Sequence, residues 1–194
     1  TIRNTQVLDA ENAGFYVSGG SPVLEQVHVE RAGGEAYFLE LDASPQFTNV
    51  TATNNFADRI SIKPGTLDED RTWDYGNLPI HIAGDLNVGV VDSDTTLTID
   101  AGTVVKFSNG AFLYVPGELN AVGTVAEPII FTGAADDAVG GDSNGDATET
   151  EIVPGSWEAI YLDSSLSVLE HVQIRYAGNR FNPGHGSGPT SAVH

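Results

Sequence analysis

The sequence predicts an all-β fold, a parallel β-helix (β-solenoid) that carries loop insertions. Three observations support this prediction: an internal repeat, a spacing of apolar residues that fits bent strands, and a composition rich in turn-forming residues. With 194 residues, the chain is long enough to bury a substantial core.

The repeat is clearest between residues 23–33, V-L-E-Q-V-H-V-E-R-A-G, and residues 168–178, V-L-E-H-V-Q-I-R-Y-A-G. A weaker third copy covers residues 44–55. In each copy, apolar residues follow a first apolar residue three and five positions later. The three triplets are Leu24/Val27/Val29, Phe47/Val50/Ala52 and Leu169/Val172/Ile174.

This spacing fits neither a helix nor one uninterrupted strand. It fits a strand that bends at a two-residue corner and then resumes its alternation. Short bent strands that recur about every 20–25 residues are typical of a β-solenoid, in which each coil buries its inward side chains against its neighbours.

Turn-forming residues are abundant, with 22 glycines beside many Asn, Asp, Ser and Thr. Gly and Asn tolerate positive φ, and short polar side chains bond to nearby backbone, so this composition suits many sharp corners. Amphipathic segments of helical period are lacking. Between the repeats, short strands are expected at residues 15–17, 38–41, 60–62, 80–82, 86–91, 96–107, 112–115, 119–122, 129–132 and 157–162.

The whole chain, residues 1–194, is predicted to be a single β-helix segment. Three stretches lack the periodicity and are expected to be loops: a surface insertion at 66–77, an Asp/Gly-rich insertion at 134–156 and a loop at 179–190. Both ends fall inside coils, and the chain contains no methionine. We therefore expect it to be a piece of a longer protein.

Charge narrows the range of partners. Eight basic and 27 acidic residues give a formal net charge of −19. Nucleic acid and anionic membranes are therefore not expected partners, because binding to them depends on a basic surface. The sequence contains no cysteine, and no apolar run is long enough for a membrane span.

Four stretches together resemble the right-handed parallel β-helix repeats of large secreted bacterial surface proteins, on the scaffold of the pectate-lyase-like superfamily. They are L-T-I-D-A-G-T-V-V-K-F, L-N-A-V-G-T-V-A-E-P-I-I-F-T-G, G-S-W-E-A-I-Y-L and L-E-H-V-Q-I-R-Y-A-G. The resemblance covers residues 80–178 well and the N-terminal third more loosely. It implies a right-handed coil and an extracellular or cell-surface location. It leaves function open, because the same scaffold carries adhesins, stalks, lyases and hydrolases.

The insertion at 134–156 contains the clearest motif, D-D-A-V-G-G-D-S-N-G-D. Asp142, Asn144 and Asp146 are spaced two apart, which is how the oxygen ligands of a calcium loop begin, and the backbone carbonyl of Thr148 would come next. Asp136 and Asp137, or an acid further along the loop, would complete the shell. The motif departs from an EF-hand, because Ala147 and Val153 occupy positions where glycine and glutamate are expected.

Calcium is the cofactor that this motif predicts, with a dissociation constant on the order of 0.1–1 mM, as in extracellular modules. A merely solvated acidic loop is the alternative. Such a charged insertion should stay disordered unless something neutralises it, which favours calcium.

Two aromatic residues in the first insertion, Trp73 and Tyr75, are candidates for stacking on a sugar ring. The alternative is that they anchor their loop to the wall of the solenoid. The sequence therefore favours a non-catalytic, calcium-binding structural or adhesive segment of an extracellular bacterial protein that presents a surface to polysaccharide. The competing hypothesis is a polysaccharide lyase or glycoside hydrolase on the same scaffold. Enzymatic activity is left undecided, with a non-catalytic role favoured.

Overall fold

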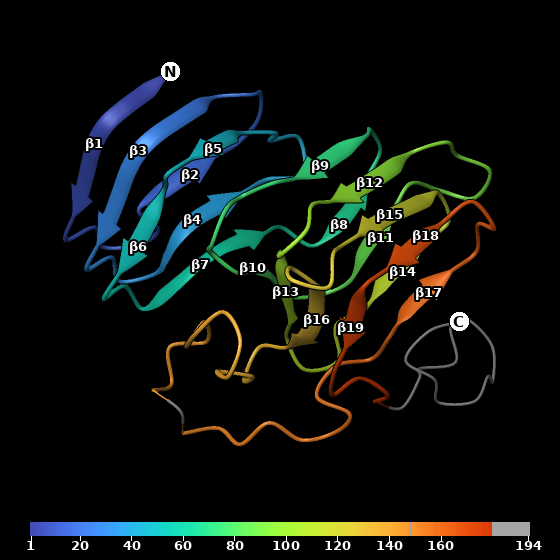
Figure 1. Cartoon of the computed structure of the whole chain (residues 1–194). Coiled ribbons are helices and arrows are strands. Elements are labelled where there is room, and N and C mark those ends of the chain that lie inside the picture. Colours follow the sequence, from blue (N-terminus) through green and yellow to red (C-terminus); the bar gives the residue numbers. More distant parts are fainter. Residues whose placement is uncertain (148, 180–194) are drawn as a thin grey trace.

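The computed structural model describes residues 1–147 and 149–179. Over these residues the chain is all-β, without a helix, and its parallel sheets stack as a solenoid of about six turns. The N-terminal coil lies at one end of the solenoid and the last described strand at the other (Figure 1). This arrangement confirms the predicted fold class. The described part of the chain has no helix that could serve as a membrane span.

One sheet runs the whole length of the solenoid, and we call it the long sheet. Its seven strands pair in the order β19-β16-β13-β10-β7-β4-β2. Their bounds are β2 (Phe15–Val17), β4 (Glu35–Leu39), β7 (Ala57–Ile62), β10 (Ile80–Ile82), β13 (Val104–Phe107), β16 (Ile129–Gly133) and β19 (Val172–Ile174).

Two further sheets close the C-terminal half into a three-sided coil. The second sheet contains β8 (Gly65–Leu67), β11 (Leu86–Val88), β14 (Leu113–Val115) and β17 (Ile160–Leu162). The third sheet contains β9 (Arg71–Trp73), β12 (Thr96–Ile99), β15 (Glu118–Val122) and β18 (Val168–Glu170). Each turn therefore passes through the second sheet, the third sheet and the long sheet in that order.

In the N-terminal half, a separate sheet takes the place of the third. It contains β1 (Ile2–Leu8), β3 (Val23–Glu30), β5 (Gln46–Thr48) and β6 (Thr51–Thr53), and β3 pairs with both β5 and β6. The predicted corner lies at the same position in each repeat. Gln26, Asn49 and His171 all have left-handed backbone, with φ of 53°, 52° and 51°. The i, i+3, i+5 spacing of apolar residues thus marks a bend, as the sequence predicted.

The core fills the interior of the coil. Leu24, Val27 and Val29 of the first triplet have no exposed surface. Further along, Phe107 stacks on Trp157 with ring centroids 4.4 Å apart, and both are fully buried. Trp157 lies where the 134–156 insertion returns to the wall, and its indole N–H donates to the carbonyl of Arg175 at 2.7 Å.

The stretch at 66–77 is not a surface insertion, contrary to the prediction. It supplies most of β8 and all of β9, so it belongs to a regular coil of the solenoid. Its acidic residues had obscured the alternation, since Asp68, Glu69 and Asp70 form the exposed turn between the two strands. The expected loop at 179–190 lies outside the described residues, apart from Asn179.

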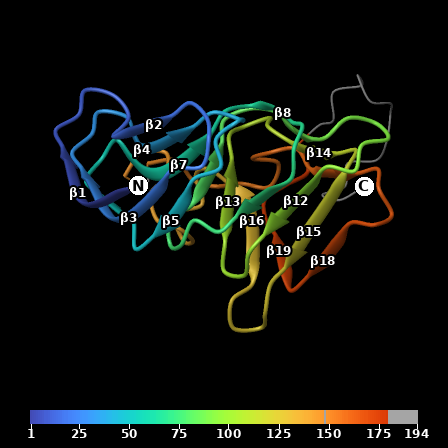
Figure 2. The same ribbon diagram turned by 90° about the horizontal axis from the view of Figure 1, so that it is seen from above.

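The insertion at 134–156 does leave the coil, between β16 and β17, as predicted. It runs beside the long sheet, toward the N-terminal coils (Figures 1 and 2). A side chain at Gly145 would meet the backbone of Phe56, so the insertion reaches back to the turn before β7. We call residues 134–156 the strap.

Candidate metal centre

Two basic side chains from the long sheet hold the strap. Lys106 of β13 donates from its Nζ to the carbonyl of Gly141 at 2.6 Å, and Arg59 of β7 donates to the carbonyl of Ser143 at 2.6 Å. Ser143 is itself fully buried, and its hydroxyl donates to the carbonyl of Ala134 at 3.3 Å. The strap is therefore a docked element of the fold.

Beneath the strap, the outward side chains of successive strands form a buried polar row. The register aligns Ser61, His81, Lys106 and Thr132 on adjacent strands. All four are at most 3% exposed. Burial lowers the pKa of Lys106, and it lowers the pKa of His81 to about 3 with the help of the nearby positive charges of Arg59 and Lys106.

Three carboxylates of the strap meet beside this row. One ligand oxygen from each of Asp137, Asp142 and Asp146 lies within 4.8 Å of the other two. Two of these residues were singled out by the two-apart spacing, and Asp137 joins them from the other end of the motif. We call this group the carboxylate cluster.

Backbone N–H groups fix the conformation of the loop that carries the cluster. Asp142 accepts from the N–H of Gly145 at 2.7 Å and from that of Ala147 at 2.9 Å. Asp146 accepts from the N–H of Thr150 at 3.1 Å. Left-handed backbone at Gly141, Gly145 and Ala147 turns the chain around these carboxylates. The Asp/Gly composition is thus what allows the loop to curl.

Asp137 differs in its surroundings from an ordinary surface carboxyl. Its Oδ1 atom is buried and has no hydrogen-bond partner. Burial raises the pKa of Asp137, and the negative charges of Asp142 and Asp146 raise it further, against the opposing effect of Lys106. A buried carboxylate oxygen without a donor is costly, and a bound cation would remove that cost.

The other predicted ligands take different positions. Asp136 lies outside the cluster, because its carboxylate accepts from the hydroxyl of Thr132 at 2.7 Å and lies 3.9 Å from the guanidinium of Arg175. Asn144 lies at the cluster, but its side-chain N–H donates to Asp146 at 2.8 Å and its carbonyl oxygen accepts from the Asp146 N–H at 3.4 Å. Thr148 lies outside the described residues.

The donor set suits a hard cation such as calcium. Calcium takes oxygen ligands, most often carboxylates and backbone carbonyls, in flexible geometry. Asp137, Asp142 and Asp146 supply three carboxylates in one place. No cysteine or histidine belongs to the cluster, so the donors lack the sulfur and nitrogen atoms that transition metals prefer.

The aromatic candidates for sugar binding are misplaced. Trp73 is 1% and Tyr75 is 3% exposed, and the ring of Tyr75 packs against Phe47 with centroids 5.2 Å apart. Both side chains belong to the core, so neither presents a face to a ligand. The alternative interpretation, that they anchor their segment, matches their position.

Sequence reasoning missed the polar row beneath the strap. A signal was present, because Ser61, His81 and Lys106 each stand between two inward apolar residues of a short strand. That pattern shows that the side chains point outward. It does not show that a segment from elsewhere in the chain covers them.

No family model, curated protein or solved structure matches this chain.

Proposed function

We propose that this chain is a non-catalytic, calcium-binding β-helical segment with a structural and adhesive role in an extracellular bacterial protein. Calcium binds the carboxylate cluster and fixes the strap against the long sheet. The observation that carries the proposal is the convergence of Asp137, Asp142 and Asp146, with one buried Asp137 oxygen left without a donor.

The extracellular part of the proposal follows from the kind of site. Three carboxylates on a surface loop favour a weak site, with a dissociation constant on the order of 0.1–1 mM. Such a site fills only where calcium is abundant, as it is outside cells. The resemblance to repeats of secreted bacterial surface proteins points the same way.

A structural role suits the solenoid. Each coil contacts only its neighbours, so rigidity and length grow with the number of coils. A lyase on this scaffold would need a basic side chain that reaches its substrate. Lys106, whose charge acts on Asp137, is fully buried beneath the strap and is withheld from a substrate. This burial supports a non-catalytic role.

Thermal unfolding with and without calcium tests the proposal. At ten times the dissociation constant, binding adds about 1.4 kcal/mol of stability. For a chain of this length, that raises the Tm by roughly 3–6 °C. Magnesium at the same concentration should have a smaller effect, because it prefers smaller and more rigid sites.

Two variants localise the effect. Asp137→Asn should abolish the calcium-induced rise in Tm, while Asp68→Asn, on the exposed turn between β8 and β9, should keep it. Isothermal titration of the wild type should give one calcium per chain. A Tm that calcium leaves unchanged, or a rise that survives Asp137→Asn, would rule out this site.

A further inference from the structure

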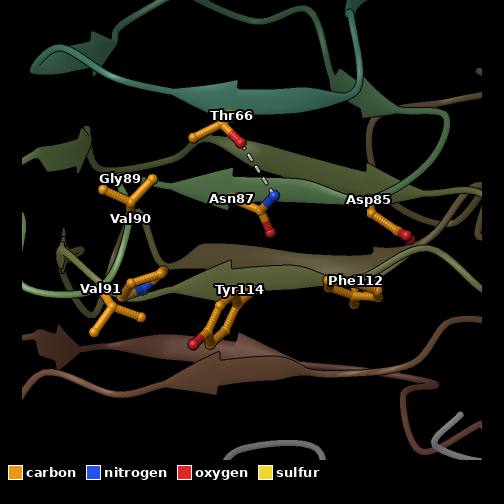
Figure 3. A pocket seen from close by; sticks show the side chains of 9 residues that line it. Thr66, Asp85, Asn87, Gly89, Val90, Val91, Phe112 and Tyr114 are labelled. Atoms are coloured by element: carbon orange, nitrogen blue, oxygen red, sulfur yellow. Dashed lines mark hydrogen bonds between the residues drawn. The ribbon is translucent and has the colours of Figure 1, made fainter. Parts of the chain in front are cut away.

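A groove on the outer face of the second sheet carries the further inference. Its floor is formed by the outward side chains Thr66, Asn87 and Tyr114, which the register of β8, β11 and β14 places in one row (Figure 3). The cavity above them has a volume of about 340 Å³. A second cavity of about 430 Å³ continues it past Val91 and Pro116, which line both. The two cavities therefore adjoin at these residues, and we call them together the groove; the row of its floor crosses β8, β11 and β14.

The groove combines apolar surfaces with hydrogen-bonding groups. Phe112 and Tyr114 contribute aromatic rings, and Val90 and Val91 at its edge are 62% and 69% exposed. The polar side chains sit between these surfaces, with Asn87 donating to the hydroxyl of Thr66 at 3.2 Å. Flat apolar patches beside amide, hydroxyl and carboxylate groups match the apolar face and hydroxyl-bearing edge of a sugar ring.

Tyr114 is held in place for such a contact. Its hydroxyl donates to Asp163 at 2.5 Å, beyond the end of β17. In the same row, the ring of Tyr161 packs edge-on against Phe112, with centroids 5.7 Å apart and an interplanar angle of 82°. Rigid aromatic rings lose little entropy on binding, which favours them as anchors.

Charge decides the class of ligand. Three aspartates line the two cavities, Asp85, Asp92 and Asp163, and no basic side chain lines either. Anionic ligands, including uronate polysaccharides, would be repelled. Carboxylates accept hydrogen bonds from neutral hydroxyl groups. The side chains of the floor follow one another at about the 4.8 Å spacing of the strands. This favours a linear ligand that offers hydroxyl groups at regular intervals.

We propose that this groove binds a neutral polysaccharide chain along the solenoid axis, with Tyr114 as its central aromatic contact. The proposal rests on the adhesive role proposed above, for which it supplies the ligand surface. The groove contains no residue of the carboxylate cluster. A failure of the calcium experiments can therefore be told apart from a failure of polysaccharide binding.

Affinity electrophoresis tests the proposal with defined probes. The protein is run in gels that contain a soluble β-glucan, a xylan or a mannan, and in a gel that contains polygalacturonate, each with calcium and with chelator. At least one neutral polysaccharide should retard the protein, with or without calcium. Polygalacturonate should not. Retardation in none of the neutral gels, or equal retardation by polygalacturonate, would overturn the proposal.

Variants place the binding in the groove. Tyr114→Ala should lower the affinity obtained from the retardation about ten-fold or more, through loss of one aromatic contact. Val91→Asp should weaken retardation as well. Val91 is exposed, so this substitution should leave the stability of the fold unchanged. Tyr16→Ala is the control, because Tyr16 lies on β2, outside the groove, and like Tyr114 it donates its hydroxyl to a carboxylate, that of Glu40. Retardation by a neutral polysaccharide that survives both groove variants would refute the assignment. So would a protein that binds an oligolysine peptide and is retarded by none of the polysaccharides.

Discussion

Acid should destabilise this protein through one buried imidazole, and replacing His81 should remove that effect. His81 is 3% exposed beneath the strap. Its Nε2 lies 3.0 Å from the hydroxyl of Ser108, and its Nδ1 has no hydrogen-bond partner. Burial, together with the positive charges of Arg59 and Lys106, lowers the pKa of His81 to about 3. The folded protein therefore keeps this imidazole neutral.

The sign of the effect follows from linkage. An unfolded chain protonates histidine near its ordinary pKa of about 6.5. Between that value and the folded pKa of about 3, the unfolded state binds a proton that the folded state does not. The free energy of unfolding therefore falls as the pH falls, by about 1.4 kcal/mol per pH unit. From pH 7.5 to pH 5.0, His81 alone should cost about 2 kcal/mol.

Urea unfolding of the wild type and of His81→Gln, measured in chelator at several pH values, isolates this contribution. The stability difference between the two proteins should shift by about 2 kcal/mol in favour of His81→Gln on going from pH 7.5 to pH 5.0. Ser61→Ala is the matched control, because Ser61 lies beside His81 in the buried row and does not titrate. Its profile should run parallel to that of the wild type. If His81→Gln also runs parallel, the imidazole is not held neutral in the fold.

Two further substitutions test the strap and the coil. Lys106→Met should enlarge the calcium-induced rise in Tm. The reason is that the ammonium of Lys106 and the proposed calcium ion act on the same carboxylates. An unchanged rise would mean that Lys106 does not influence the cluster. Asn55→Ala should lower the free energy of unfolding by about 1–3 kcal/mol in urea, because Asn55 accepts from the Ala32 N–H at 2.8 Å and donates to the Val29 carbonyl at 3.1 Å. Asn120→Ala, at an exposed position on β15, is the control, and an equal loss in both variants would remove the special role of Asn55.

The fold could be predicted from the sequence because the repeat records a local geometry. Each triplet needs one left-handed residue two positions after its first apolar residue, and the structure has Gln26, Asn49 and His171 there. The order of the walls could not be predicted in the same way. Ile99, Val115 and Phe131 are equally spaced in sequence, yet they lie on the third, second and long sheets. The coil is longer than this spacing, since Val105 pairs with Phe131 of the next turn.

Part of the carboxylate cluster was also predictable. The spacing of Asp142 and Asp146 reflects how a loop curls, which is a local property. The exclusion of Asp136 depends on Thr132, which lies on β16, and on Arg175, which directly follows β19. Trp73 and Tyr75 were misplaced for the same reason, because an acidic turn hid two regular strands. Contacts between residues of different coils cannot be deduced from the spacing of residues in the sequence.

The strap is held to the long sheet through its backbone. Arg59 and Lys106 both donate to backbone carbonyls of the strap, at Ser143 and Gly141. The two basic groups that dock the strap thus use backbone oxygens for these hydrogen bonds, and Lys106 acts on Asp137 through its charge. The fold thus brings three like charges within 4.8 Å of one another, at a cost that protonation of Asp137 or binding of a cation would relieve. At neutral pH a cation is the more effective of the two, because it can interact with all three carboxylates at once.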